Sequence, residues 1–170
     1  MKREPICTRC VAKGRWAVFL ATGFGVGTVP VAPGTVGTLL AVPIYLLLST
    51  ANLLLYLDIL VVLLVVGLVV CHTASAILGD DHPAIVWDEI VGFLITMVAA
   101  PAHWVWLVAG FLLFRLFDIW KPFPIRQVQD RLHGGPGTMF DDVLAGVYAW
   151  LCLQGLILLS VRFDWTLPGG

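Results

Sequence analysis

Three polar clusters interrupt an otherwise apolar sequence, and they carry the side chains best suited to chemistry. They contain five carboxylates and two bases: Asp88, Glu89, Arg115, Asp118, Lys121, Asp141 and Asp142. Carboxylates beside hydrocarbon are costly and usually mark function. We therefore interpret the three clusters as parts of one polar site.

Five carboxylates in one site would repel one another, and their pKa values would rise. A divalent cation relieves this repulsion, and all-oxygen ligands suit Mg²⁺, which also binds substrate phosphate. The sequence therefore predicts a Mg²⁺ site whose ligands come from Asp88, Glu89, Asp118, Asp141 and Asp142. Adjacent acids diverge by about 100° around a helix, so one member of each adjacent pair can instead cap a helix or orient a ligand.

Positive charge and a glycine-rich segment complete the predicted site. Arg115 can clamp a phosphate with two hydrogen bonds, while Lys121 acts as a point charge. Arg115 also lies three residues before Asp118, so the two can form a purely structural ion pair. Residues 22–38 are rich in Gly and Pro, and we expect a loop that enters a helix near Thr35 and offers backbone N–H groups to phosphate. The same segment is also compatible with a simple connector. We expect the phosphate to contact Gly34, Thr35 and His133.

These groups at a membrane surface indicate phosphoryl chemistry on a lipid. We expect hydrolysis, with the metal polarising the phosphate and activating a water, and a carboxylate nucleophile is the alternative. The predicted catalytic residues are Asp88, Glu89, Asp118 and Asp142. The chain has no Asp-x-Asp motif, and four residues separate Cys10 from Arg15 where a cysteine-phosphatase loop has five. These absences argue against two soluble phosphatase classes.

The composition indicates an integral membrane protein. Of the 170 residues, 59% are apolar and 12% are charged, and the mean hydropathy is +0.95. Soluble domains have roughly 45–50% apolar and about 25% charged residues. The net charge of −1 gives no basic footprint, so we expect no nucleic-acid partner.

The predicted organisation is one membrane domain between two tails. Residues 1–15 carry five basic residues and one acid, which predicts a cytoplasmic N-terminus, and they do not resemble a signal peptide. Cys7 and Cys10 form a lone CxxC, too few ligands for structural zinc, whereas Cys71 and Cys152 fit packing roles. Residues 16–160 form the domain, and residues 161–170 form a short tail.

The apolar pattern predicts an all-α, polytopic helical bundle of about five spans, some of them tilted or half-buried. Two spans fill residues 36–78, a third runs from 83 or 84 to 100, and a fourth covers 102–120. Residues 123–140 form a polar loop, and the last span runs from 141 or 142 to about 160. This topology places every polar cluster on the cytoplasmic face. A four-span alternative, with residues 90–117 as one helix, would separate the clusters.

Four ordered motifs resemble the phosphatidylglycerophosphatase A family: Gly25–Thr38, His82–Gly92, Phe114–Pro124 and His133–Gly146. The resemblance implies an all-helical, Mg²⁺-dependent lipid phosphatase of the bacterial inner membrane. It implies conversion of phosphatidylglycerophosphate to phosphatidylglycerol and phosphate, with the seven charged residues above as functional positions. Pro136 and Thr138 stand where the family's glycine loop has Leu and Ile. This departure affects the expected conformation of the loop more than the expected chemistry.

Two other functions remain as alternatives. In a small transporter or channel subunit, the carboxylates would line a path across the membrane. In a non-catalytic scaffold of a lipid-synthesis complex, they would not be needed for catalysis.

Overall fold

The computed structural model describes residues 8–80, 82–123, 125, 127 and 135–163. These residues form α-helices and one 3₁₀ turn and contain no strand, which confirms the all-helical prediction. In chain order the elements are α1 Thr8–Ala21, η1 Val26–Thr28, α2 Pro33–Leu48, α3 Leu53–Leu78, α4 Trp87–Thr96, α5 Trp104–Trp120 and α7 Gly135–Arg162.

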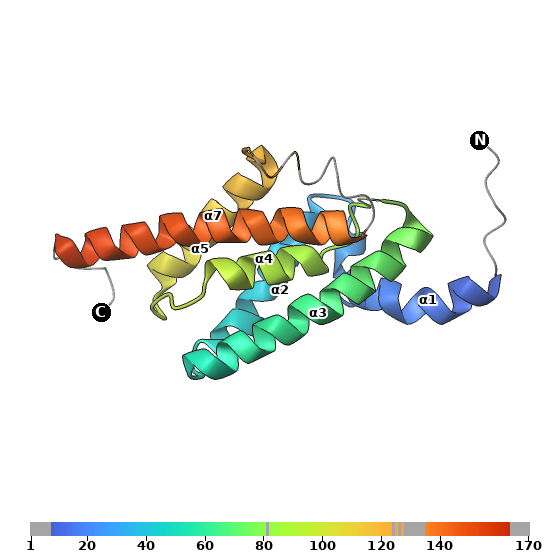
Figure 1. Ribbon diagram of the computed structural model, residues 1–170, viewed down its shortest axis with the longest axis horizontal. Helices are drawn as coiled ribbons and strands as arrows, with labels where there is room; N and C mark the ends of the chain where they lie inside the picture. Colours follow the sequence, from blue (N-terminus) through green and yellow to red (C-terminus); the bar gives the residue numbers. More distant parts are fainter. Residues whose placement is uncertain (1–7, 81, 124, 126, 128–134, 164–170) are drawn as a thin grey trace.

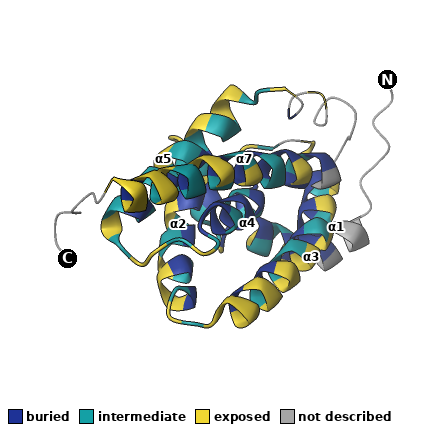
Figure 2. Cartoon of the chain, turned by 60° about the vertical axis from the view of Figure 1, so that its left-hand side comes forward, coloured by how far each residue is buried: buried dark blue, intermediate teal, exposed yellow. Residues whose placement is uncertain are grey.

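The short helix α4 lies at the centre of the bundle. It packs against α2, α3, α5 and α7, and most of its residues are buried (Figure 2). Phe93 of α4 meets the rings of Tyr45, Phe111 and Phe114 edge-on, with centroids 6.3–6.4 Å apart. The outer helices therefore surround α4 and fix its position.

Helices α4 and α7 run in the same direction and touch through small residues. A Cβ atom at Gly146 would overlap the backbone of Gly92, and the Thr96 hydroxyl of α4 donates to the Gly146 carbonyl of α7 at 3.4 Å. Close backbone approach at small residues is common in membrane helices. Asp88 lies four residues before Gly92, and Asp142 lies four residues before Gly146. The close contact of Gly92 with Gly146 therefore places Asp88 and Asp142 at the same level along the two helices, one turn before that contact.

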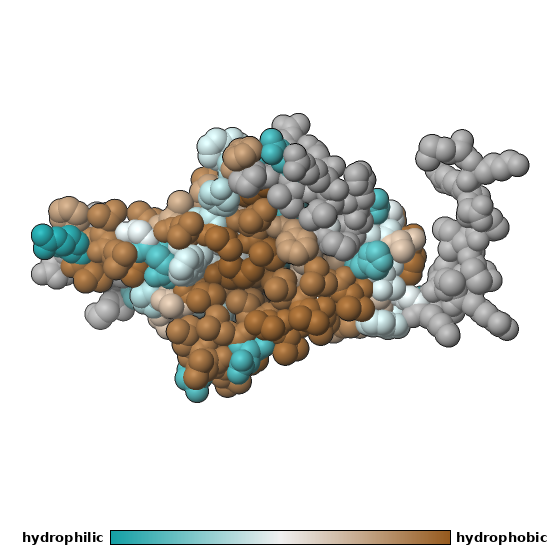
Figure 3. Space-filling model, viewed as in Figure 1, coloured by the Kyte–Doolittle hydropathy of each residue, from teal (hydrophilic) through white to brown (hydrophobic). Residues whose placement is uncertain are grey.

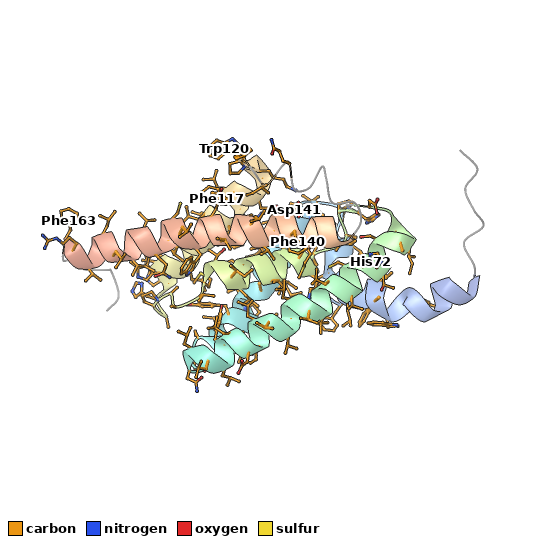
Figure 4. The ribbon with its side chains drawn as sticks, viewed as in Figure 1. His72, Phe117, Trp120, Phe140, Asp141 and Phe163 are labelled. Carbon is orange, nitrogen blue, oxygen red and sulfur yellow. The ribbon has the colours of Figure 1, made fainter. Side chains whose placement is uncertain are left out.

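Two helices, Leu53–Leu78 of α3 and Gly137–Arg162 of α7, are long and apolar enough to cross a membrane. Only 22% of the most apolar window of α3 is buried, unlike the core helix of a soluble protein. One broad face of the molecule is continuously hydrophobic, with hydrophilic residues at its margins (Figure 3). Trp104 and Trp120, at the two ends of α5, are 58% and 69% exposed (Figure 4 labels Trp120). Tryptophans are enriched where membrane helices meet the water interface, and these exposed positions are in line with that preference.

The predicted third span is wrong in length. The expected helix over 83–100 is only the ten residues of α4, about 15 Å long, and cannot cross about 30 Å of hydrocarbon. Five full spans are therefore not confirmed. A break between Thr96 and Trp104 contains Ala99 at φ 56°, so residues 90–117 are not one helix either.

Two predicted helix starts are also wrong. Helix α2 begins at Pro33 rather than near Thr35, with Ala32 as its N-cap at φ 47°. Helix α7 begins at Gly135, although its glycines and Pro136 were expected to prevent a helix before Asp141. Both errors have one cause: proline suits the first turn of a helix, where its missing N–H has no partner to lose.

Candidate active site

The polar clusters converge at the end of the bundle where α7 begins (Figure 1). Helices α2, α4 and α7 begin at this end, and α3 and α5 finish there. A cavity of about 230 Å³ lies among them. It is lined by Ala32, Pro33, Gly34, His82, Pro83, Ile85, Asp88, Glu89, Arg115, Asp118, Lys121, Thr138, Asp141 and Asp142.

The cavity includes all five predicted carboxylates, both bases and Gly34. Thr35 lies in the first turn of α2 but is not among the lining residues, so its predicted phosphate contact gains no support. His133 lies outside the described residues. The structure thus brings most of the predicted site residues together, while their individual roles stay predictions.

Arg115 joins two of the carboxylates. Its Nη1 lies 2.7 Å from Asp118 Oδ2, one turn along α5, and 3.2 Å from Glu89 Oε1 on α4. The structural ion pair with Asp118 therefore forms, but it does not use the whole side chain. Arg115 Nε and Glu89 Oε2 are buried and have no hydrogen-bond partner within the described part of the chain. A donor and an acceptor thus remain available at the cavity.

Lys121 reaches back from the end of α5 to α7. It caps α5 in the left-handed conformation, with φ 44° and ψ 63°, which is uncommon for a residue other than glycine. Its Nζ lies 2.5 Å from Oδ2 of Asp141, which Figure 4 labels near the start of α7. Burial lowers the pKa of Lys121, but the hydrogen bond and charge of Asp141 outweigh this effect and raise it overall. Lys121 therefore remains charged.

Asp88 and Asp142 are the most isolated acids of the site. They are 2% and 4% exposed, and neither forms an ion pair with Lys or Arg in the described residues. Burial raises the pKa of Asp88, and the charges of Glu89 and Asp141 add to this. The two carboxylates therefore lack the positive charge that would stabilise them.

Glu89 sits between α2 and α5. Burial raises its pKa to about 7, although the charge of Arg115 opposes this. A Cβ atom at Gly34 or Gly37 would overlap the Glu89 carboxylate, so α2 presents a bare glycine face to it. These two glycines are one turn apart and fix how closely α2 approaches the acid.

The donor set fits a hard cation, since among the described lining residues five carboxylates face two bases, and Glu89 Oε2 has no hydrogen-bond partner among them. In the described residues, however, no group of three His, Cys, Asp or Glu side chains is placed so that it could hold a metal ion together. Mg²⁺ typically binds proteins through one or two carboxylates, with waters and substrate phosphates completing its shell. An incomplete protein cage is therefore compatible with that metal.

Comparison with known proteins identifies the family. The sequence profile described as Phosphatidylglycerophosphatase A matches residues 19–157. The chain belongs to the phosphatidylglycerophosphatase A family. A protein of that name from Escherichia coli K12 is 44% identical over 150 residues, 87% of this chain and 84% of the relative. Another from Haemophilus influenzae Rd is 45% identical over 136 residues, covering 76% and 82%.

A third relative carries a different substrate in its name. The Bacteroides thetaiotaomicron protein named "Putative phosphatidylinositol-3-phosphatase" is 42% identical over 144 residues, 80% of this chain and 90% of the relative. No solved structure matches the chain significantly. All three relatives are named as phosphatases of phosphorylated lipids.

Sequence reasoning missed three residues of this site. His82 lines the cavity, and its Nδ1 accepts a hydrogen bond from the Ala84 backbone at 3.2 Å. Thr138 also lines it, from the part of α7 that was expected to be a loop. Gly37 presses against Glu89 without lining the cavity. A signal existed for two of them: His82 stands six residues before Asp88, and Gly37 follows Gly34 at helical spacing.

Proposed function

We propose that this protein hydrolyses the terminal phosphate of phosphatidylglycerophosphate, yielding phosphatidylglycerol and inorganic phosphate. Family membership supports the reaction. The structural observation that carries it is the cavity, which gathers five carboxylates, an arginine and a lysine at one end of an apolar bundle. A phosphate carried by a lipid can reach such a cavity without leaving the membrane surface.

Three features of the chain suit the phosphate. Helices α2 and α4 begin at the cavity, and their N-termini carry partial positive charge. Arg115 Nε is an unused buried donor. Lys121 adds a positive charge held next to α7. Together these groups bind and orient a dianion that the five carboxylates alone would repel.

The carboxylates that lack an ion pair are the natural metal ligands. Asp88 and Asp142 would hold Mg²⁺, while Glu89 and Asp118 are engaged by Arg115, and Asp141 by Lys121. When bound, Mg²⁺ neutralises charge on the phosphate and lowers the pKa of a water. The burial of Asp88 and Asp142 keeps this acid pair away from bulk water.

The apolar helices and the basic N-terminus suggest the location. We infer that α3 and α7 cross the bacterial inner membrane, helped by the shorter helices, and that the cavity opens at the cytoplasmic face. Five basic residues among residues 1–15 favour a cytoplasmic N-terminus. Helix α1 leads from this segment toward the cavity end of the bundle (Figure 1).

The direct test is phosphate release from phosphatidylglycerophosphate in detergent micelles with Mg²⁺. We expect activity that EDTA abolishes and that added Mg²⁺ restores. Asp118→Ala should retain little activity. Wild-type activity that persists in EDTA would contradict the metal role, and full activity of Asp118→Ala would favour the scaffold alternative.

The third relative adds a substrate comparison. Phosphatidylinositol 3-phosphate should be tested beside phosphatidylglycerophosphate at equal surface concentration. We expect phosphatidylglycerophosphate to be preferred, because the two relatives named for it are slightly more similar to this chain. If the protein preferred the inositol lipid, the proposed hydrolysis of a lipid phosphate would stand, and the proposed substrate would be wrong.

A further inference from the structure

A second, apolar cleft adjoins the polar cavity. It has a volume of about 450 Å³ and lies between the end of α1, the segment around η1, the end of α3 and the turn before α4. Pro33, His82 and Pro83 line both spaces, so the two share a wall. We refer to them together as the charged half and the apolar half of one binding region.

The walls of the apolar half contain mainly hydrocarbon. Val18, Val29, Pro30, Leu78 and Ala84 line it, with no Asp, Glu, Lys or Arg side chain among the described lining residues. This contrasts with the seven charged side chains of the neighbouring cavity. The boundary between the charged walls and the apolar walls matches the structure of a phospholipid monoester. In such a lipid a charged phosphate is joined to an apolar glycerol ester and acyl region.

The residues beside the cleft are also apolar where they face outward. Phe19 and Phe24 pack edge to face with centroids 5.4 Å apart, and both are more than half exposed. Val31 is 75% exposed. A large exposed apolar surface indicates contact with membrane or protein. The mouth of the cleft therefore suits the surrounding lipid rather than water.

His82 marks the border between the two halves. Its Nδ1 accepts the Ala84 N–H at 3.2 Å, so the neutral ring carries its proton on Nε2. A donor at this border suits an ester or glycerol oxygen, which lies between the phosphate and the acyl chains of a phospholipid.

We propose that the apolar cleft binds the glycerol ester region and the first methylenes of one acyl chain of the substrate, while its phosphate occupies the polar cavity. The proposal rests on the function proposed above and assigns how the lipid is held. It makes Val29 and Leu78 specificity-determining residues for an acylated substrate.

The test compares two neighbouring substitutions. Val29 lines the cleft and Val31 does not, yet both lie in the same exposed segment. Val29→Asp should lower kcat/KM for long-chain phosphatidylglycerophosphate about tenfold relative to Val31→Asp, equivalent to losing the burial of roughly two methylenes. The inhibition constant of inorganic phosphate, a probe of the polar half alone, should stay the same in both variants.

A second measurement does not depend on turnover. A phosphatidylglycerophosphate with a diazirine near the ester end of one acyl chain should crosslink to Val18, Val29 or Leu78. Equal kinetics of the two variants, crosslinks confined to the outer face of α3, or equal labelling by a phosphate-free diacylglycerol would each overturn the proposal. Failure of the proposed function is separate: the wild-type protein would then release no phosphate from this lipid, whatever the labelling pattern.

Discussion

The two ends of the bundle use polar groups in opposite ways. At the end away from the cavity, Tyr56 donates to the Leu94 carbonyl at 2.7 Å, and Trp150 and Gln154 both donate to the Val98 carbonyl. These bonds satisfy backbone groups in and after the last turn of α4. At the cavity end, buried carboxylates outnumber bases, and two buried side-chain atoms have no partner within the described residues.

The difference separates stability from function along one short helix. The far end of α4 is held by neutral donors, each paired with a carbonyl. The near end contains Asp88 and Glu89, whose charged forms are destabilised by burial and mutual repulsion. Groups that weaken a fold without a cation or phosphate are best explained by the ligand they bind. Substitutions at the cavity end should therefore lower activity without lowering stability. Substitutions at the far end should lower stability with little change in activity.

The largest effect is expected for the unpaired acids. Asp88→Asn and Asp142→Asn should each lower kcat by about 10²-fold or more, since each would remove a negative charge from the proposed metal site. Because burial raises the pKa of Asp88, its ionised form destabilises the fold at neutral pH. Asp88→Asn should consequently keep or raise the Tm measured without Mg²⁺. A clear fall in the Tm of Asp88→Asn together with intact activity would show that the cavity end of α4 serves stability rather than function.

A glycine next to the site should give the next largest effect. Gly37→Ala places a methyl group against Glu89 and Val86, so we expect at least a tenfold loss of kcat/KM. Gly155→Ala in α7 is the matched control, because a Cβ there meets nothing within 4 Å. Similar activity of the two variants would show that the approach of α2 does not position Glu89.

Lys121 tests the charge held at the end of α5. Lys121→Met keeps much of the side-chain volume and removes the ammonium group, leaving the buried Asp141 without this ion pair. We expect KM to rise about tenfold with a smaller change in kcat, because the proposed role of Lys121 is to bind phosphate as a point charge. Lys121→Arg should recover part of the affinity, and an unchanged KM in Lys121→Met would remove this residue from phosphate binding.

The smallest effect on activity is expected at the far end. Tyr56→Phe removes the hydrogen bond to the Leu94 carbonyl and should lower the free energy of unfolding by about 0.5–1.5 kcal/mol. Activity measured well below the Tm should stay within about twofold of wild type. A large loss of kcat would show that the far end of α4 also controls the chemistry.

Much of this division could be predicted from the sequence. The acids are rare interruptions of apolar runs, and alternating helices return each cluster to the same end. The length of α4 could not be predicted, because residues 97–100 are apolar enough to continue a helix and only tertiary packing shows where it ends. The start of α7 was missed because the first turn of a helix tolerates Gly and Pro.

The contacts within the site were less predictable. The sequence indicated the Arg115–Asp118 pair by its spacing, but the partner of Lys121 depends on a left-handed residue that no local pattern indicates. His82 and the apolar cleft depend on four segments that meet only in the folded chain. Periodicity predicts which residues share a helix face, whereas neighbours on other helices depend on the fold.

The central claim is that Asp88 and Asp142 share one divalent cation at the cavity. The most direct measurement is Mn²⁺ binding to the purified protein, followed by electron paramagnetic resonance, with wild type, Asp88→Asn and Asp142→Asn compared. We predict saturable binding to wild type that Mg²⁺ displaces and that phosphate strengthens, and a large loss of affinity in both variants. Equal Mn²⁺ affinity in all three proteins would contradict the account.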